Sequence, residues 1–173
     1  MYQASKGALI FIALLLALAF AISPLGTRNA YASVTGKVIE VSLSQGQLSA
    51  YNDDNLVYTS LIVSGRPGLE TPIGTYHVFA KLSPTTFRSP WPPSSPYYYP
   101  PTYINFALEF REGGYFLHDS WWHTSYGPGT NGWHLDPAYG WQYGSHGCVS
   151  MPFSAAKWLY SWAPIGTTVQ INP

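Results

Sequence analysis

The chain contains a single cysteine, Cys148, so no internal disulfide can stabilise its fold. A domain without such cross-links depends on its hydrophobic core, whereas small exported domains usually rely on disulfides. An unpaired thiol is also at risk of oxidation wherever the surroundings are oxidising. In an exported chain, this combination favours a chemical role for Cys148 over a packing role.

The first 32 residues have the pattern of a secretory signal peptide. Lys6 precedes an uninterrupted apolar run over residues 8–22, and Ala30-Tyr31-Ala32 matches a small-x-small cleavage site. The apolar run is short for a transmembrane helix, which needs about 20 residues. We therefore expect a signal peptide over 1–32, a single exported domain over 33–173, and membrane attachment only if the signal segment stays uncleaved.

The predicted domain carries a nearly balanced charge. Lys6 and Arg28 precede it and all eight acidic residues lie within it, which leaves six basic and eight acidic side chains, a balance of −2. This balance argues against a nucleic-acid partner, which requires a basic face. Charged residues are 9% of the chain and aromatic residues 17%, so much of the surface must consist of Tyr, Trp, Ser, Thr and Pro.

Short β-prone runs separated by turn residues predict a mainly β domain. The expected strands lie at 38–41, 48–51, 56–63, 75–81, 103–110, 115–118 and 167–171. Gly113-Gly114 is the expected turn of a hairpin. One helix is expected from Ser154, its predicted N-cap, because apolar residues follow at helical spacing.

Two segments lack a regular pattern. Residues 83–102 are rich in Pro, Ser and Tyr, and the prolines argue against a strand or helix there. This segment is either a surface loop or a lid whose tyrosines, Tyr99 among them, border a substrate groove. Residues 121–144 are irregular and rich in aromatic residues, of which Trp122 is a candidate to line the same groove.

Cys148 ends the motif Ser145-His146-Gly147-Cys148, and a second histidine, His118, lies upstream. A thiolate attacks carbonyl groups, and a nearby imidazole lowers the pKa of a thiol or accepts its proton. Gly147 leaves room for a substrate and lets backbone N–H groups face a developing oxyanion. Both histidines are candidate bases. His146 is a candidate because residues i and i+2 of a strand share a face, which would place it on the side of Cys148.

These motifs resemble those of the L,D-transpeptidase catalytic domain, the YkuD-type fold, whose signature is a histidine, a variable spacer and then Ser/Thr-His-Gly-Cys. The matching segments are His118-Asp119, residues 144–152, Thr71-Pro72-Ile73-Gly74, and the segments 47–51 and 159–169. The resemblance covers roughly residues 35–173. It implies a YkuD-like β-sandwich of mixed sheets with one or two short helices.

The chain departs from the family pattern in two places. Ser150 stands where the family usually has Asn or Arg, so the contact made by that side chain is in question. The spacer between His118 and Ser145 is longer than usual and is expected to reshape one side of the groove.

The resemblance implies acyl transfer between peptidoglycan stem peptides at the cell wall, outside the bacterial cytoplasmic membrane. A donor stem ending in D-alanine is attacked at the carbonyl of its third, L-centred residue, a diamino acid, and D-alanine leaves. The acyl group then passes to the side-chain amine of another stem, giving a 3→3 cross-link. The resemblance also implies inhibition by carbapenem-type β-lactams, and thiolate acyl transfer needs no cofactor or metal.

The roles that the resemblance implies fall on a few residues. Cys148 is the nucleophile, and His118 takes and returns its proton. The backbone N–H groups of His146, Gly147 and Cys148 face the oxyanion. His146 is a supporting residue or the alternative base. Asp119 is a candidate to orient His118, although a neighbouring strand residue points elsewhere, so a backbone carbonyl is the other candidate. Substrate contacts are expected from Ser145, Ser150, Trp122 and Tyr99.

Three other functions stay open at this stage. A cell-wall cysteine peptidase, acting as a carboxypeptidase or endopeptidase, would form the same acyl-enzyme and transfer it to water. A non-catalytic wall-binding module would use the aromatic surface but would not need the thiol and its histidine. A metal-dependent wall hydrolase would leave Cys148 unexplained, and no H-E-x-x-H spacing is present. Its candidate ligands would be His118, His123, His134, His146, Asp119 and Asp136.

Overall fold

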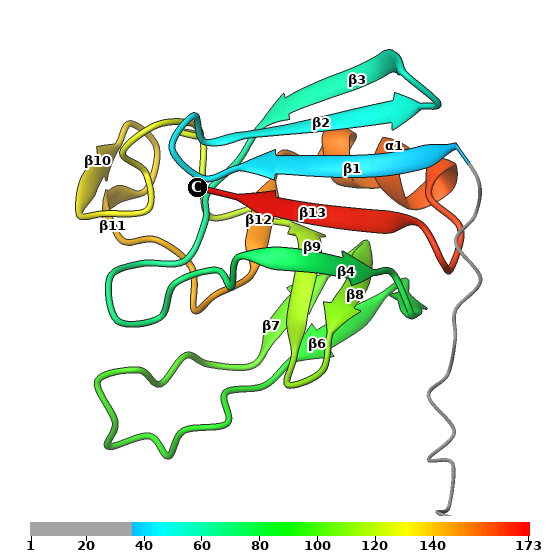
Figure 1. The fold of residues 1–173 in the computed structure, drawn as a ribbon. Coiled ribbons are helices and arrows are strands. Elements are labelled where there is room, and N and C mark those ends of the chain that lie inside the picture. The colour runs from blue at the N-terminus through cyan, green and yellow to red at the C-terminus, as the bar shows by residue number, and fades with distance from the viewer. Residues whose placement is uncertain (1–35) are drawn as a thin grey trace, which may run out of the picture. The chain divides into compact units, whose positions relative to one another are not determined.

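The computed structural model describes residues 36–173, and the predicted signal peptide at 1–32 lies outside these residues. The described chain forms two mixed β-sheets, two short hairpins and one helix (Figure 1). The predicted fold class, a mainly β domain of mixed sheets with a short helix, is confirmed. Within 36–173 the structure contains no helix with the length and apolar character needed to cross a membrane.

The five-stranded sheet has the order β3-β2-β1-β13-β4. Its strands are β1 (Lys37–Ser42), β2 (Gln47–Asn52), β3 (Asn55–Leu61), β4 (Gly74–His77) and β13 (Thr168–Asn172). β1 runs parallel to β13, with Ile39 opposite Val169, and the other neighbouring pairs are antiparallel. Ile39, Val41 and Leu48 are fully buried, so alternate residues of this sheet face the core.

The four-stranded sheet has the order β12-β9-β8-β5 and holds the segments expected to form the site. Its strands are β5 (Ala80–Leu82), β8 (Ala107–Arg111), β9 (Tyr115–Asp119) and β12 (Val149–Met151). β8 and β9 form the predicted hairpin, in which Gly113 and Gly114 have φ values of 95° and 84° that glycine adopts without strain. β12 runs parallel to β9.

The strand predicted over 75–81 is two strands, one in each sheet. β4 ends at His77 and β5 begins at Ala80. Between them, Val78 donates its N–H to Thr167 beside the first sheet (2.9 Å), and Phe79 donates to Glu109 of the second (2.9 Å). The chain therefore passes from one sheet to the other at this point. The run of β-prone residues is unbroken here, so the sequence predicts a single strand.

Three strands of two hairpins, β6, β10 and β11, lie in segments for which no strand was predicted. β6 (Thr85–Phe87) pairs with β7 (Thr102–Ile104), and β10 (His134–Asp136) pairs with β11 (Gly140–Gln142). The prolines that argued against strands after residue 87 lie between β6 and β7, in the connecting loop over 88–101. The run predicted as one strand over 103–110 is divided between β7 and β8.

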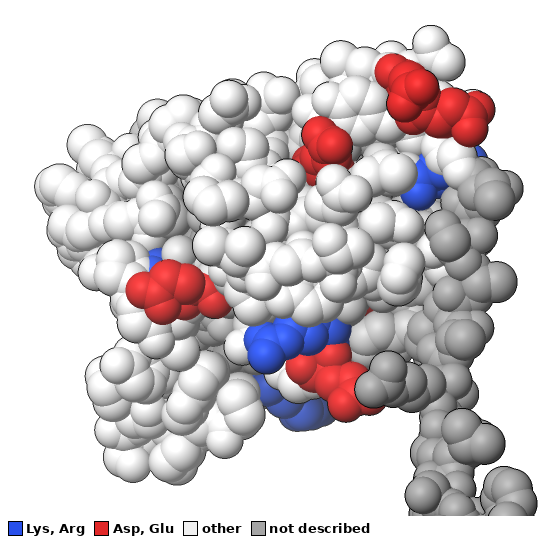
Figure 2. Space-filling view, viewed as in Figure 1, with Lys and Arg blue, Asp and Glu red and all other residues white. Residues whose placement is uncertain are grey.

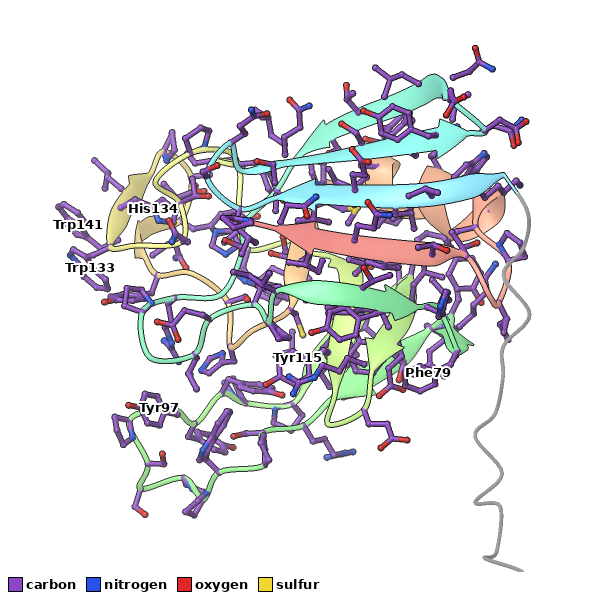
Figure 3. All side chains as sticks on the ribbon, viewed as in Figure 1. Phe79, Tyr97, Tyr115, Trp133, His134 and Trp141 are labelled. Atoms are coloured by element: carbon purple, nitrogen blue, oxygen red, sulfur yellow. The ribbon has the colours of Figure 1, made fainter. Side chains whose placement is uncertain are left out.

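The surface is poor in charge and rich in aromatic side chains, as the composition indicates. Figure 2 shows a few small groups of charged side chains separated by wide uncharged areas. Trp133 and Trp141 of the β10–β11 hairpin lie at the outer edge of the molecule (Figure 3), with exposed fractions of 61% and 60%. Their rings are stacked, with centroids 5.6 Å apart.

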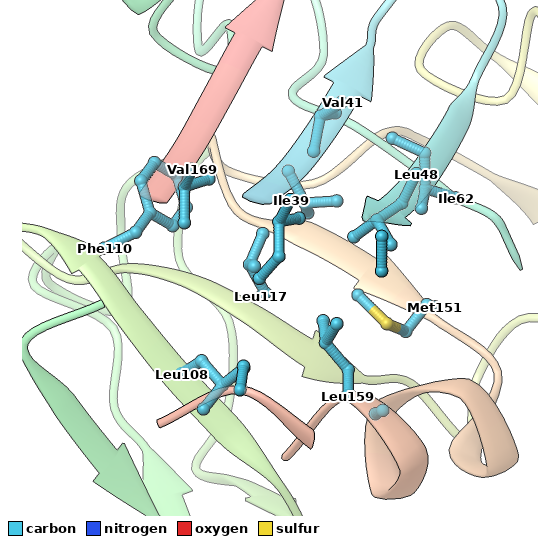
Figure 4. Close-up of a cluster of buried hydrophobic side chains, with 14 of the residues drawn as sticks. Ile39, Val41, Leu48, Ile62, Leu108, Phe110, Leu117, Met151, Leu159 and Val169 are labelled. Carbon is cyan, nitrogen blue, oxygen red and sulfur yellow. The ribbon is translucent and has the colours of Figure 1, made fainter. Parts of the chain in front are cut away.

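The core lies between the five-stranded sheet on one side and β9, β12 and the helix on the other (Figure 4). Leu117 of β9 and Met151 of β12 meet Ile39 and Leu48 from the first sheet and Leu159 from the helix. Each of these side chains is at most 2% exposed, and full burial of such a side chain contributes about 1.5–3 kcal/mol. This packing fixes β9 and β12 relative to each other, and both strands carry candidate site residues.

The helix α1 (Phe153–Trp162) packs on β8 and β9 and buries Ala155, Ala156 and Leu159. The prediction of Ser154 as its N-cap is wrong. The N-cap lies two residues earlier, at Pro152, and the helix begins at Phe153. Pro152 has the extended backbone of an N-cap residue, with φ −54° and ψ 146°, but offers no side-chain acceptor to the first N–H groups of the helix.

Two lysines from the sheets cap the C-terminal end of α1. Lys37 donates to the Trp162 carbonyl at 2.7 Å, and Lys81 donates to the carbonyls of Tyr160 (2.6 Å) and Ala163 (2.9 Å). The last turn contains no basic residue of its own. The two ammonium groups therefore supply the positive charge that favours a helix C-terminus.

Candidate active site

The parallel pairing of β9 and β12 places Cys148 and His118 on one wall. Val149 pairs with Leu117, and Ser150 pairs with His118. Because Val149 and Leu117 point into the core, their neighbours Cys148, Ser150 and His118 point to the opposite face. All three line a cavity of about 380 Å³, so the structure brings the predicted nucleophile and a predicted base into one space.

The turn before Cys148 requires glycine. Gly147 has a φ of 107°, and a Cβ at this position would lie 2.7 Å from Cε1 of Tyr115. Ser145 holds the turn, because its hydroxyl donates to the Cys148 carbonyl and accepts the Gly147 N–H at 3.0 Å. The Gly147 N–H is thus occupied, and the prediction that it faces the oxyanion does not hold in this structure. Ser145 lines the cavity, but its hydroxyl serves the turn.

His118 is 4% exposed, and its ring is held in one tautomer. Its Nδ1 donates to the backbone carbonyl of Asp119 at 2.8 Å, which leaves Nε2 as the acceptor nitrogen. Burial lowers the pKa of His118, against the smaller opposing effect of the Asp119 carbonyl and carboxylate. The imidazole is therefore neutral near neutral pH, in the form that accepts a proton. Phe87 contacts the ring edge-on at a centroid distance of 5.1 Å.

The carboxylate of Asp119 does not orient His118. It accepts hydrogen bonds from the backbone N–H of Asn105 (2.9 Å), the Asn105 side-chain amide (2.7 Å) and the backbone N–H of Phe106 (2.7 Å). These bonds tie the link between β7 and β8 to the end of β9. Of the two orienting groups considered from the sequence, the structure shows the backbone carbonyl.

His146 has both ring nitrogens engaged. Arg66 Nη2 donates to Nε2, and the Tyr97 backbone accepts a hydrogen bond from the ring. Burial lowers the pKa of His146 to about 4, with the charge of Arg66 contributing further. A guanidinium cannot accept a proton, so this Nε2 is committed as an acceptor and is not free to act as the base for Cys148.

The thiol of Cys148 is protonated at rest. Burial raises its pKa to about 11, the charge of Glu109 adds to this effect, and a hydrogen bond from the Phe116 backbone opposes it. Its Sγ donates to the Gly114 carbonyl at 3.4 Å, and among the described residues it makes no hydrogen bond to an imidazole. Of the two effects of an imidazole considered from the sequence, a lowered thiol pKa and acceptance of the thiol proton, the raised pKa favours the second. The proton must leave before the sulfur can complete its attack on a substrate.

The loop over 88–101 covers the site, which favours the lid interpretation of this segment. The rings of Trp91 and Tyr99 contact that of His146 at centroid distances of 5.5 and 5.0 Å. Tyr99 lines the 380 Å³ cavity together with Trp122, as predicted for both. A second cavity of about 320 Å³ is lined by Trp91, Tyr99, His146 and Cys148 among others. The two cavities therefore meet at Cys148 beneath this loop.

The sequence matches the YkuD family, the L,D-transpeptidase catalytic domain, over residues 36–171. The chain belongs to this family. No match is found among curated proteins.

Solved L,D-transpeptidases share the fold. An Enterococcus faecium enzyme, solved as a cysteine-to-serine mutant, is 27% identical with a TM-score of 0.64, over 79% of this chain and 49% of that chain. The Stackebrandtia nassauensis enzyme is 25% identical with a TM-score of 0.58, over 82% and 57%. L,D-transpeptidase 3 from Mycobacterium tuberculosis, in complex with a faropenem-derived adduct, is 23% identical with a TM-score of 0.62, over 80% and 60%. The chain thus spans about half to three fifths of the length of these proteins.

Ser150, at the position where this L,D-transpeptidase domain departs from its family, is 1% exposed. Its hydroxyl donates to the Val63 carbonyl at 3.4 Å, and the backbones of the two residues exchange hydrogen bonds at 2.8 and 2.9 Å. The side chain therefore fastens β12 to the segment after β3. It borders the cavity without directing a free polar group into it.

The residues proposed for a metal site do not form a donor set. Within residues 36–173, no group of three or more His, Cys, Asp or Glu side chains is placed to hold a metal ion. His123 and His134 stack on each other at 5.8 Å, while His146 bonds to Arg66. The carboxylate of Asp136 accepts from backbone N–H groups, among them that of Thr124 at 2.6 Å.

Arg66 is the site residue that sequence reasoning missed. It lies in the segment after β3, between two recognised motifs, and nothing in its local sequence marks it. The structure brings it in through a bridge between Gly65 and Ser145, next to which the Arg66 N–H donates to the Ser145 carbonyl at 3.0 Å. This pairing between distant segments is what identifies Arg66 as a site residue, and it exists only in the folded chain.

Proposed function

We propose that this L,D-transpeptidase domain transfers acyl groups between peptidoglycan stem peptides and forms 3→3 cross-links. The observation that carries the proposal is the placement of Cys148 and a neutral, oriented His118 on one cavity wall by the β9–β12 pairing. The Cys148 sulfur attacks the carbonyl of the third residue of a donor stem. The bond between that carbonyl and D-alanine then breaks.

His118 moves the proton in both halves of this reaction. As the S–C bond forms, Nε2 takes the thiol proton, and the resulting imidazolium gives it to the amine of the departing D-alanine. The thioester is then attacked by the side-chain amine of a second stem, whose proton returns through His118 to the sulfur. Because the resting thiol is protonated, the reaction needs a base that takes its proton, and His118 is placed to do so.

The two cavities that meet at Cys148 fit a reaction with two peptide substrates. One contains His118 and the other contains Trp91 and Gly114, and both contain Cys148. We assign the His118 side to the leaving and attacking amines, because both must reach the same proton carrier. The acyl portion of the donor stem then occupies the other side.

Acylation of Cys148 tests the proposed chemistry directly. The M. tuberculosis relative holds a faropenem-derived adduct, so faropenem and a carbapenem are suitable probes of this thiol. Intact-protein mass spectrometry should show one adduct on the wild-type domain and none on Cys148→Ser. Unchanged labelling of Cys148→Ser would contradict the proposal.

Product analysis separates transfer from hydrolysis. A tetrapeptide stem should release D-alanine and give a cross-linked dimer when an amine acceptor is present. A cysteine peptidase would instead give the tripeptide acid at the same rate with and without the acceptor. The predicted signal segment supports a location outside the cytoplasmic membrane, which fractionation of cells expressing the full chain would test.

A further inference from the structure

Arg66 is a cation without a counter-ion inside the larger cavity. Sixteen residues line this cavity, and none of the other fifteen is an Arg, Lys, Asp or Glu. No carboxylate pairs with it anywhere in residues 36–173, and the nearby Glu70 is exposed and accepts from the Gly68 N–H at 2.8 Å. The charge in the cavity is therefore uncompensated in the substrate-free protein.

The guanidinium is held by neutral groups. Nη2 donates to His146, and the carbon Cζ lies 5.5 Å from the ring centroid of Tyr143 and 5.8 Å from that of Tyr97. Its Nε is buried and has no hydrogen-bond partner among the described residues. Aromatic rings and an imidazole nitrogen fix the position of the group but do not neutralise it.

A half-buried guanidinium of this kind favours an anionic ligand. Burial lowers the pKa of Arg66, which reflects the cost of holding its charge away from water. A carboxylate is the natural complement, because the planar fork of a guanidinium matches its two oxygens. His118, the proton carrier for the leaving amine, lines the same cavity.

We propose that Arg66 binds the α-carboxylate of the D-alanine that leaves the donor stem, a role that rests on the proposed function. In that residue a single carbon joins the reacting nitrogen to the carboxylate. A group that holds the carboxylate therefore also places the nitrogen near His118. Arg66 then selects stems with a free terminal carboxylate over stems whose terminus is amidated.

The first test compares a tetrapeptide stem ending in D-alanine with its C-terminal amide, measured as kcat/KM for release of the last residue. A charge-assisted hydrogen bond predicts a preference for the free acid of about ten- to a hundred-fold in the wild type. Arg66→Met should abolish this preference, and Arg66→Lys should retain part of it. The matched control, Lys157→Met on the exposed face of α1, should behave as the wild type. If Arg66→Met slows both substrates equally and keeps the preference, Arg66 only positions His146 and the proposal is wrong.

The second test does not depend on turnover. Calorimetric binding of the same two peptides to Cys148→Ala should show tighter binding of the acid, and the Cys148→Ala, Arg66→Met double variant should bind both equally. Equal binding to the single variant would overturn the carboxylate site. Tighter binding of the acid, combined with no release of D-alanine by the wild type, would instead count against the proposed transferase function. Circular dichroism of each variant confirms that it is folded.

Discussion

Ser150 lies directly opposite His118 in the parallel pairing of β12 with β9. Because Cys148 precedes Ser150 by two positions, it shares the face on which His118 lies. Cys148 and His118 are far apart in the sequence, and the register of the two strands brings this nucleophile and this base into one site. The assignment of His118 as the base rests on it.

The two histidines should differ sharply when they are replaced. His118→Ala should slow acylation of Cys148 by faropenem about 10²- to 10⁴-fold, the usual contribution of a general base. His146→Ala should have a smaller effect, because both of its nitrogens already bond to Arg66 and the Tyr97 backbone. Both acylation rates are measured by stopping the reaction at a series of times and determining the acylated fraction by intact-protein mass spectrometry. A larger loss in His146→Ala than in His118→Ala would reverse the assignment.

The acid limb of the pH–rate profile should lie below the ordinary histidine value. Burial lowers the pKa of His118, so its neutral, proton-accepting form persists as the pH falls through 6.5. Acylation should still exceed half of its maximal rate at pH 6.5 and pass its midpoint at a lower pH. The measurement is the rate of acylation from pH 4 to 8, with far-ultraviolet circular dichroism at each pH to exclude unfolding. A midpoint above 6.5 would show that the ring is easier to protonate than its burial indicates.

The resting thiol should react slowly with small alkylating agents. Burial raises the pKa of Cys148 to about 11, so at pH 8 far less thiolate is present than in an exposed cysteine. The rate of alkylation by iodoacetamide should keep rising through pH 10. The urea-denatured chain provides the control, with a midpoint at about 8.5. A native midpoint below that of the denatured chain would contradict a raised thiol pKa.

Asp119→Asn should reduce stability more than it alters the chemistry. The carboxylate accepts three hydrogen bonds from Asn105 and Phe106, and an amide replaces one acceptor oxygen with a donor. We expect a loss of about 1.5–3 kcal/mol in the free energy of unfolding, measured by urea denaturation. Asp54→Asn, in the exposed β2–β3 turn, is the matched control. If the variant keeps its stability but loses acylation, Asp119 acts on His118 after all.

Gly147→Ala should impair acylation through the turn that carries Cys148. Alanine at a φ of 107° is strained by about 1–2 kcal/mol, and its Cβ would meet the Tyr115 ring at 2.7 Å. Gly129→Ala is the control, because Gly129 also has a positive φ, 85°, but a Cβ there meets nothing within 4 Å. The rate of labelling by faropenem should fall in the first variant and not in the second. Equal rates would show that the turn tolerates a side chain.

The sequence predicts those parts of the fold that depend on local patterns. Short β-prone runs separated by turn residues identify the first two strands, and Gly113-Gly114 identifies the hairpin that ends near His118. The motif ending in Cys148 identifies the candidate nucleophile without any structure. Each of these signals lies within a few consecutive residues.

The features that the sequence does not predict depend on contacts between distant segments. The passage between sheets at Val78 and Phe79 is set by partners in Thr167 and Glu109, so local β-propensity does not reveal it. Arg66 joins the site only through the bridge from Gly65 to Ser145. The raised pKa of Cys148 follows from burial by the completed fold and not from its neighbouring histidine.

The parallel pairing of β9 and β12 has a consequence for the timing of reactivity. His118 and Cys148 are 30 residues apart, so an extended chain does not place the His118 imidazole beside the sulfur. The general base therefore reaches the nucleophile only when the sheet closes, and a chain in which β12 has separated from β9 lacks this pair.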